Sequence, residues 1–365
     1  MTLSAELILT VLPLTVCLYW FVWFLAEHRR ADAAKKMLTV FFGVCSILYF
    51  CHTLLYHRYV ETGLPTPLEA LWAACSLSVY PIYFLYICRL TAQPASPRLT
   101  VRLLAPGLLV ALAILCWNNE TTDSVRQALN ALQVLCVVVF GYRRLRGFDR
   151  KLTELYAETE DKSVLPIRIL LVAVLLTSIS SFVLNILGRD YVITNHGMIP
   201  FALVPMAVLL FVLGYIGSKR SFRVEQFLTD NPEETPPDAP AENKELGAKI
   251  EHLMVTEAYY LHQNVTLMDV ARKVGSCRTY VSNYINQELR CSFSDYVNRL
   301  RIEHAKMVMM QHERHGSDSK FSAIALNVGF SGEQSFYRNF RKFVGMTPMA
   351  WLEQQRSKAS AATAL

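Results

Sequence analysis

Seven apolar runs, each close to the roughly 20 residues that a helix needs to cross a bilayer, fill most of the N-terminal part of this chain. Hydrophobic residues make up 53% of the sequence and the mean hydropathy is +0.26, which are high values for a soluble chain. The runs are Leu7–Ala26, Met37–Tyr56, Leu68–Cys88, Val101–Trp117, Val125–Tyr142, Pro166–Leu187 and Met198–Gly217. The sequence therefore predicts seven transmembrane helices. The first is expected to be retained, because no Lys or Arg precedes it and no cleavage site follows it.

Positive charges are distributed unequally over the connections between these runs. Alternate connections carry sixteen Lys and Arg residues, whereas the opposite connections carry only Arg58, Arg126 and Arg189. The sixteen are Arg29, Arg30, Lys35, Lys36, Arg89, Arg98, Arg102, Arg143, Arg144, Arg146, Arg150, Lys151, Lys162, Lys219, Arg220 and Arg223. Because cytoplasmic loops are enriched in Lys and Arg, we expect a multi-pass protein of a bacterial inner membrane. Its N-terminus would lie outside and its C-terminus in the cytoplasm.

The composition changes after the last apolar run. Between Glu225 and Glu242 there are six acidic residues, four prolines and no basic residue. A segment of this composition cannot bury a core, so we expect an extended linker. The sequence thus predicts a seven-span membrane domain with a sensing role at residues 1–218 and a juxtamembrane segment and acidic linker at 219–243. A soluble domain at 244–357 and a frayed tail at 358–365 follow.

Two pairs of short helices, each interrupted by a glycine, are predicted in the soluble domain. In the first pair, Thr266 caps a helix that ends at Val274, Gly275 breaks it, and a second helix begins near Arg278. The second pair repeats this plan around Gly329, and its second helix carries three phenylalanines at helical spacing. A helix, a tight turn and a second helix is the geometry that places the second helix in a DNA major groove. The predicted fold class is all-α: a seven-helix transmembrane bundle plus a C-terminal double helix-turn-helix domain.

A longer amphipathic helix, Phe293–Met310, is predicted between the two pairs. At 1.5 Å per residue it spans roughly 27 Å, close to the ~34 Å helical repeat of DNA. Two recognition helices held this far apart can enter successive major grooves on one face of the duplex. We also expect one amphipathic helix from Ile250 to Leu261 that packs on the first pair. A final helix is expected after Thr347 and Pro348.

Two runs in this part carry a specific pattern: SFSDYVNRLRIEHA and, above all, IALNVGFSGEQSFYRNFRKFVGMTP. Through them, about a third of the chain resembles the DNA-binding domain of the AraC/XylS family of bacterial transcription regulators. The resemblance implies sequence-specific binding to double-stranded DNA. The sugar-binding barrel usual in that family is missing, and the membrane part stands in its place.

The resemblance also places base-contacting side chains on the second helix of each pair. Arg suits guanine, Asn or Gln suits adenine, and Ser or Thr is permissive. Arg341 and Lys342 are expected to contact phosphates or to face solvent. Glu333 is acidic, and Asn283 stands where many members have a long basic residue, so the operator sequence does not carry over. The expected DNA-binding set is Arg278, Thr279, Ser282, Asn283, Glu333, Gln334, Tyr337, Arg338, Arg341 and Lys342.

No motif for catalysis accompanies these features. The sequence has no P-loop, nucleophile elbow or paired-carboxylate motif, so we predict no enzyme, no cofactor and no metal site. Gln127, Asn130 and Gln133 recur at helical spacing in the fifth apolar run. Hydrogen bonding between helices is the simpler interpretation of these residues, with ligand binding as the alternative.

These patterns together predict a membrane-integrated one-component transcription regulator that contacts lipid and binds DNA as a homodimer. Its signal would be a small molecule or a protein acting at the membrane domain, by changing dimerisation or the reach of the DNA-binding domain. The alternative is a transporter or membrane enzyme that carries a regulatory DNA-binding domain. A third interpretation is proteolytic release of the DNA-binding domain through the Pro-rich linker.

Overall fold

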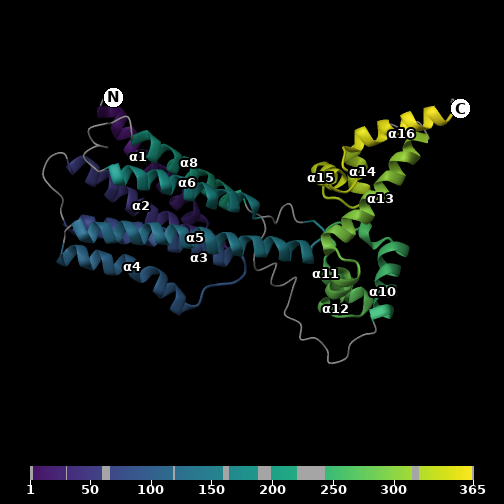
Figure 1. Ribbon diagram of the computed structural model, residues 1–365, viewed down its shortest axis with the longest axis horizontal. Helices are drawn as coiled ribbons and strands as arrows, with labels where there is room; N and C mark the ends of the chain where they lie inside the picture. Colours follow the sequence, from purple (N-terminus) through teal and green to yellow (C-terminus); the bar gives the residue numbers. More distant parts are fainter. Residues whose placement is uncertain are drawn as a thin grey trace. The chain divides into compact units, whose positions relative to one another are not determined.

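A computed structural model describes residues 3–29, 31–59, 66–117, 120–158, 164–187, 199–219, 243–314 and 320–363 (Figure 1). The chain divides into two compact units. The first comprises Met1–Phe148 and Val164–Thr229, and the second comprises Asp149–Ser163 and Asp230–Leu365. The described residues are helical apart from turns, loops and one isolated antiparallel bridge, between Tyr156 and Thr266, so the fold class is all-α as predicted.

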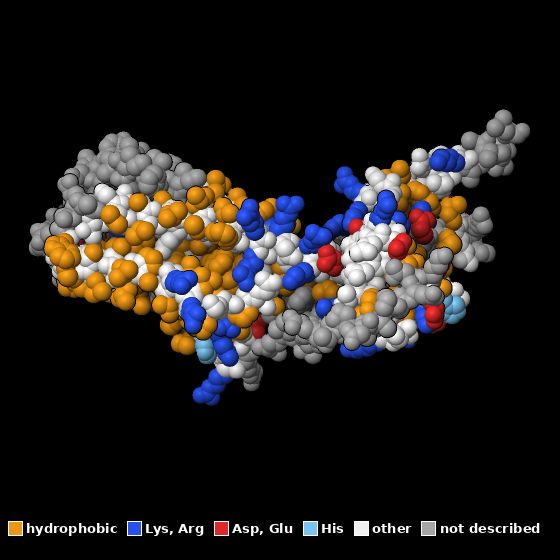
Figure 2. All heavy atoms as spheres, turned by 60° about the horizontal axis from the view of Figure 1, so that its bottom comes forward, with side chains coloured by type: hydrophobic (Ala, Val, Ile, Leu, Met, Phe, Trp, Pro, Cys, Tyr) orange, Lys and Arg blue, Asp and Glu red, His pale blue; other side chains and the backbone are white. Residues whose placement is uncertain are grey.

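Long apolar helices make up the described part of the first unit, and they coincide with the seven apolar runs of the sequence. They are α1 (Leu3–Glu27), α2 (Ala33–Tyr59), α3 (Thr66–Leu90), α4 (Pro97–Cys116), α5 (Glu120–Leu155), α6 (Leu165–Leu187) and α8 (Ile199–Lys219). Helices α1 to α5 are long and apolar enough to cross a membrane, and the described apolar parts of α6 and α8 are shorter. Hydrophobic side chains cover most of the visible face of this unit (Figure 2). Such a surface is typical of a protein in contact with lipid.

Neighbouring helices of the first unit pack closely. Helix α1 packs on α2 and α8, and α3 packs between α2 and α4. The backbone of α8 approaches α1 so closely that a Cβ atom on Gly214 would lie 2.4 Å from the Trp20 ring. Glycine therefore sets the distance between these two helices, as small residues do where helices meet in a membrane.

The second unit is built from shorter helices. They are α10 (Asn243–Glu251), a π-helical turn (His252–Thr256), a 3₁₀ turn (Tyr259–Leu261), α11 (Leu267–Val274), α12 (Arg278–Asn283), a π-helical turn (Tyr284–Glu288), α13 (Phe293–Arg314), α14 (Phe321–Asn327), α15 (Glu333–Val344) and α16 (Pro348–Thr363). Two apolar cores lie along α13. Val297 belongs to the core beneath α11 and α12, whereas Ile302 and Ala305 belong to the core beneath α14 and α15.

The segment before the first helix pair differs from the single helix expected over Ile250–Leu261. The helix α10 passes into a π-helical turn, and Ala258 then takes a left-handed conformation with φ +51° before the 3₁₀ turn. This break places Tyr260 in the core beneath α11, where it is buried. The gain from burying an aromatic ring offsets the cost of about 1–3 kcal/mol for a non-glycine residue in this backbone region.

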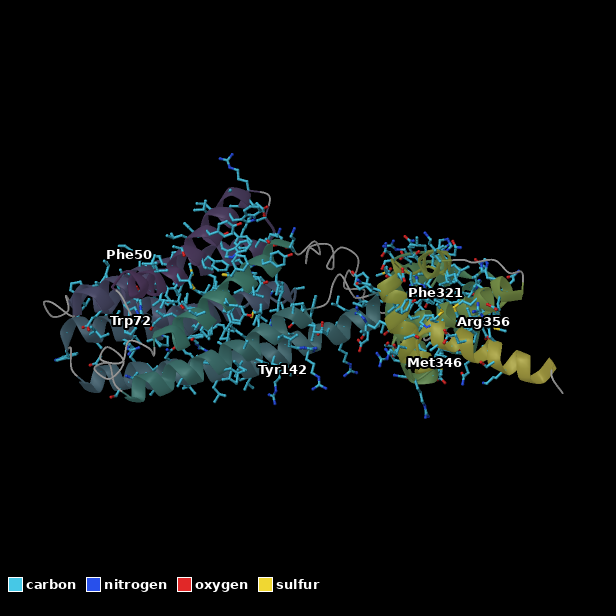
Figure 3. All side chains as sticks on the ribbon, turned by 90° about the horizontal axis from the view of Figure 1, so that it is seen from above. Phe50, Trp72, Tyr142, Phe321, Met346 and Arg356 are labelled. Carbon is cyan, nitrogen blue, oxygen red and sulfur yellow. The ribbon has the colours of Figure 1, made fainter. Side chains whose placement is uncertain are left out.

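Helix ends also differ from the expected ones. Helix α13 continues to Arg314, four residues past Met310. Helix α16 starts at Pro348, where Thr347 caps it by accepting a hydrogen bond from the Ala350 amide at 3.2 Å, and it runs to Thr363. Arg356 of α16 forms a two-point ion pair with Glu313 of α13, at 2.7 Å for each bond (Figure 3). The acidic linker predicted at 219–243 lies almost wholly outside the described residues.

Candidate nucleic-acid interface

The first helix pair starts at a capping box. The Thr266 hydroxyl accepts a hydrogen bond from the Asp269 amide, and the Asp269 carboxylate accepts one from the Thr266 amide, each at 3.1 Å. This reciprocal pairing satisfies two amides at the start of α11 that have no partner within the helix. Gly275 ends α11 with φ +68°, a left-handed conformation that suits glycine. The predicted cap at Thr266 and break at Gly275 are both confirmed.

The second helix of this pair, α12 with the π-helical turn that follows it, buries Val281 and Ile285. The expected contact residues lie on the other side: Thr279 and Ser282 are half-buried and Asn283 is exposed. Asn286 is exposed, four residues after Ser282, and its side-chain amide donates a hydrogen bond to the Ser282 hydroxyl at 3.1 Å. Asn286 extends the same polar stripe by one turn, and the sequence-based set did not include it. Its spacing of seven residues from Thr279 is the signal that identifies it.

The turn of the second pair requires glycine for two reasons. Gly329 has φ +93°, and a Cβ atom there would lie 2.6 Å from the Leu261 carbonyl oxygen. The turn between α14 and α15 is therefore packed directly against the chain that precedes the first pair. This contact links the second pair to the segment before the first pair, in addition to the link through α13.

Helix α15 has a buried face and a polar face. Ser335, Phe336 and Phe340 are buried, and Gln334 and Arg338 are exposed. Glu333, Arg341 and Lys342 are exposed too. Gln334, Arg338 and Arg341 are spaced by four and three residues and therefore share one face of the helix. That face carries two guanidinium groups and one carboxamide, which are the side-chain types that bind guanine and adenine edges or phosphates.

Two expected contact residues have partners within the domain. Tyr337 is half-buried, with its ring edge-to-face against Phe321 and Phe336 at centroid distances of 5.8 and 5.9 Å. Burial, and to a lesser degree the charge of Glu333, raises the pKa of Tyr337. The ammonium of Lys342 forms an ion pair with Asp295 of α13. Tyr337 thus contributes to packing, and Lys342 presents a partly neutralised charge.

Helix α13 packs against both helix pairs. Its 22 residues correspond to about 33 Å at 1.5 Å per residue. This is closer to the ~34 Å repeat of DNA than the length expected from sequence.

A buried arginine lies at the centre of the second unit, and the sequence-based reasoning did not identify it. Arg301 of α13 is fully buried, and its guanidinium donates hydrogen bonds to the carbonyl oxygens of Tyr260 and His262, each at 2.8 Å. It also forms an ion pair with Glu158 at 3.0 Å. Burial lowers the pKa of Arg301 to about 10, and the charge of Glu158 opposes this shift. The sequence does contain a signal for the burial of Arg301, because it lies four residues from both Val297 and Ala305, which are buried.

The segment that follows α5 contacts both helix pairs. The Ala157 amide donates to the Val265 carbonyl at 3.1 Å, and the Ala157 carbonyl accepts from Ser294 and Asn298 at 2.7 and 2.8 Å. The Glu158 carboxylate, besides pairing with Arg301, accepts a hydrogen bond from the Ser331 amide at 2.9 Å, close to the start of α15. We call residues 156–158 the docking segment. The sequence-based domain prediction included these residues in the membrane domain at 1–218, but they belong to the second unit.

Comparison with known proteins agrees with this geometry. Residues 270–354 match the family model described as a helix-turn-helix domain. The fold and this match define the C-terminal part of the chain as a helix-turn-helix domain, a fold that binds DNA.

Individual relatives are transcriptional regulators. An uncharacterised HTH-type transcriptional regulator of Staphylococcus aureus strain MSSA476 is 32% identical over 89 residues, which cover 24% of this chain and 11% of that protein. The uncharacterised HTH-type transcriptional regulator YtdP of Bacillus subtilis is 29% identical over 119 residues, covering 33% of this chain and 14% of the relative. The melibiose operon regulatory protein of Escherichia coli K12 is 30% identical over 96 residues, covering 26% of this chain and 30% of the relative.

These matches cover between 24% and 33% of this chain. The chain spans less than a third of the length of each of these curated relatives. No solved structure matches the chain. The family match lies wholly within the second unit.

Proposed function

We propose that this chain is a membrane-integrated, one-component transcription regulator. The first unit spans a bacterial inner membrane with the C-terminus in the cytoplasm, and the second unit binds specific sites on double-stranded DNA as a homodimer. Five helices of suitable length and composition and the uneven distribution of Lys and Arg support the membrane part. A cytoplasmic C-terminus would place the DNA-binding unit in the compartment that contains DNA.

The proposal rests on the two helix pairs that pack on α13, each of which turns at a glycine. Each pair buries one face of its second helix and leaves a polar face of the kind that reads bases. We assign base contacts to Arg278, Thr279, Ser282 and Asn283 in the first pair, with Asn286 added. In the second pair we assign them to Glu333, Gln334 and Arg338, with phosphate contacts from Arg341.

Control by the first unit is supported by helix α5 and the docking segment. The helix starts in the first unit and continues without interruption to Leu155, and the docking segment follows directly (Figure 1). A movement of α5 along or about its axis would act on the buried contact between Glu158 and Arg301. A continuous helix transmits such a movement better than a flexible linker, because its backbone hydrogen bonds hold its length and twist.

DNA binding by the full-length protein in lipid nanodiscs tests the proposal. Binding sites are selected from random duplexes, and affinity is measured for the wild type, Arg338→Ala and the control Lys358→Ala. Loss of a bidentate base contact costs about 1–3 kcal/mol, so Arg338→Ala should weaken binding roughly 5- to 150-fold for each chain on the DNA and relax specificity where the second helix pair of each chain binds. Lys358 is exposed on α16, and its loss removes the same charge without touching a polar face.

Two results would contradict the proposal. One is the absence of any enriched sequence, and the other is equal binding by Arg338→Ala and Lys358→Ala.

The topology has its own test, in which green fluorescent protein or alkaline phosphatase is fused after Leu365. We expect the green fluorescent protein fusion to be fluorescent and the alkaline phosphatase fusion to be inactive. A non-fluorescent first fusion with an active phosphatase would place the C-terminus outside.

A further inference from the structure

The first unit contains a cavity of about 270 Å³ among five of its helices. Helices α2, α3, α5, α6 and α8 all contribute side chains to its wall. Aromatic and aliphatic residues line most of it, including Tyr49 on α2 and Leu210 on α8. In size it is at the lower end of the roughly 300–1,000 Å³ of small-molecule sites, and it shares their mainly apolar lining.

Helices α3 and α5 run parallel and in register along this cavity. In the second turn of each helix, the guanidinium of Arg126 on α5 lies 4.5 Å from the centre of the Trp72 ring on α3 (Figure 3). Farther along both helices, a Cβ atom on Gly141 would lie 3.1 Å from the Ile87 side chain. The two pairs are separated by the same number of positions, so each level on α3 can be matched to a level on α5.

The permanent charge at this cavity is already engaged. Arg126 is 5% exposed and stands over the Trp72 ring, and the sequence-based interpretation, which counted Arg126 with the outer connections, is corrected because the residue belongs to α5. Among the described lining residues it is the one Lys, Arg, Asp or Glu. An ionic ligand would therefore bring a charge into an apolar bundle that offers it no unengaged counter-charge, which is costly. We expect a neutral ligand.

Two buried polar atoms at the cavity have no hydrogen-bond partner among the described residues. One is the carboxamide oxygen of Asn130, one turn after Arg126 and therefore level with Ser76 on α3. The other is the hydroxyl oxygen of Tyr83, which is 3% exposed. Tyr83 follows Ser76 by two turns of α3, so the two residues lie at levels about 10 Å apart along the helices. The Asn130 oxygen requires a donor, whereas the Tyr83 hydroxyl can donate or accept.

The wall between these two levels favours an organic ligand over a row of water molecules. Val79 of α3 lies between the two levels, and Leu170 of α6 and Leu210 of α8 also line the cavity. A buried water needs two to four polar partners, and an apolar wall does not supply them. Unpaired buried polar atoms are destabilising, so a ligand that pairs with both atoms and fills the apolar space between them is favoured.

We propose that the cavity binds a neutral, elongated molecule with an oxygen at each end and an apolar chain between them. A hydroxyl at one end donates to the Asn130 oxygen, and the oxygen at the other end pairs with the Tyr83 hydroxyl. An extended eight-carbon chain separates its end groups by roughly the distance between the two levels. With about 30 Å³ for each water molecule in the liquid, the cavity matches roughly nine waters, which is room for about ten non-hydrogen atoms, as in octane-1,8-diol.

This site gives the proposed regulator its signal, and in that sense the assignment rests on the proposed function. Asn130 lies on α5, the same helix that leads to the docking segment, and Tyr83 lies on α3. A ligand paired with both would tie α5 to α3. It would thereby restrict the movement of α5 that acts on the contact between Glu158 and Arg301.

Binding of radiolabelled octane-1,8-diol to the full-length protein in phosphatidylcholine nanodiscs tests the site, and no DNA is present. Nanodiscs without protein correct for diol that dissolves in the bilayer. We expect saturable binding to the protein. The competitor 1,8-dimethoxyoctane has the same carbon chain but no hydrogen to donate to the Asn130 oxygen. At equal concentration in the bilayer it should compete at least tenfold more weakly than unlabelled diol.

Conservative variants test the two polar contacts. Tyr83→Phe removes only the hydroxyl and should weaken diol binding roughly 2- to 12-fold, the net effect of one hydrogen bond. The matched control is Tyr86→Phe, which removes a hydroxyl from a buried tyrosine three residues further along α3 that is not among the lining residues. It should bind the diol as the wild type does. Asn130→Leu removes the acceptor with little change in size and should weaken binding by a factor similar to that of Tyr83→Phe.

Three results would overturn the proposal: no saturable binding, equal competition by the diol and 1,8-dimethoxyoctane, or Tyr83→Phe binding as tightly as Tyr86→Phe. If Tyr83→Phe does not give a monodisperse protein, Asn130→Leu takes its place, and wild-type affinity in that variant would refute the site. Since DNA binding is measured separately, failure here leaves the proposed function standing, and failure of DNA binding leaves the site standing.

Discussion

The ion pair between Glu158 and Arg301 gives the sharpest prediction about the docking segment. Its side chains are 8% and 0% exposed, and the pair also holds the Ser331 amide and two backbone carbonyls. Removing one member of a buried pair typically costs about 3–5 kcal/mol, because a desolvated charge is left without its counter-charge. Arg301 keeps its two carbonyl acceptors, so we expect Glu158→Ala to cost about 3 kcal/mol, at the lower end of that range.

The assay is hydrogen exchange of the full-length protein in nanodiscs. The reporter is the Ala157 amide, whose bond to the Val265 carbonyl forms only when the docking segment is in place. A loss of about 3 kcal/mol raises the open population roughly 100-fold, since each 1.4 kcal/mol is a factor of ten. Exchange at Ala157 should accelerate by a similar factor. The matched control is Glu154→Ala, which removes the partner of Arg150 in an exposed pair and should cost at most about 1 kcal/mol.

A second variant tests whether the cost comes from the unpaired charge. Replacing both members of a buried pair by apolar residues is often neutral, whereas removing one is not. Glu158→Ala combined with Arg301→Met should therefore protect Ala157 better than Glu158→Ala alone. The reasoning fails if Glu158→Ala and Glu154→Ala exchange at the same rate, or if the double variant is no better protected than Glu158→Ala.

The remaining predictions concern the second helix pair. Gly329→Ala combines a φ of +93° with a Cβ atom 2.6 Å from a carbonyl oxygen, so it should unfold the second pair and abolish DNA binding. Gly332→Ala should leave DNA binding unchanged, because Gly332 is extended and nothing lies within 4 Å of the position that its Cβ atom would take. Equal effects of Gly329→Ala and Gly332→Ala on DNA binding would contradict the packing argument. Arg341→Ala should lower the salt dependence of DNA binding by about one unit of slope for each bound chain. Lys342→Ala should lower it less, because Asp295 already pairs with Lys342, and a larger effect of Lys342→Ala would refute this ranking.

Local signals in the sequence predicted most of the helices. The apolar runs coincide with the helices of the first unit because a run of about 20 apolar residues has few alternatives to a helix of that length. Thr266 and Gly275 were placed correctly because a capping box and a left-handed glycine depend on neighbours only a few residues away. The end of α13 was placed too early, since the polar residues after Met310 remove the apolar periodicity without ending the helix.

Features that depend on distant residues were not predicted. Glu158 and Arg301 are 143 positions apart, and nothing in either neighbourhood indicates the other. Arg126 was interpreted as a residue of the outer connections, because its charge was counted without knowledge of Trp72, which lies on a different helix. Ala258 was expected in a helix because it continues the apolar periodicity of Ile250 and Met254, and tertiary packing of Tyr260 overrides that pattern.

The docking segment can affect both helix pairs at once because it contacts each of them. Ala157 bonds to Val265, next to the cap of the first pair, and Glu158 bonds to Ser331, in the turn of the second. A signal that withdraws the segment would remove both contacts together and leave Arg301 without its counter-charge between the two pairs. DNA contacts by both helix pairs should then weaken together, whereas Arg338→Ala affects only the contacts of the second pair. In the regulator that we propose, signal control through this segment would act on the relative placement of the two polar faces, on which binding of one chain to two successive grooves depends.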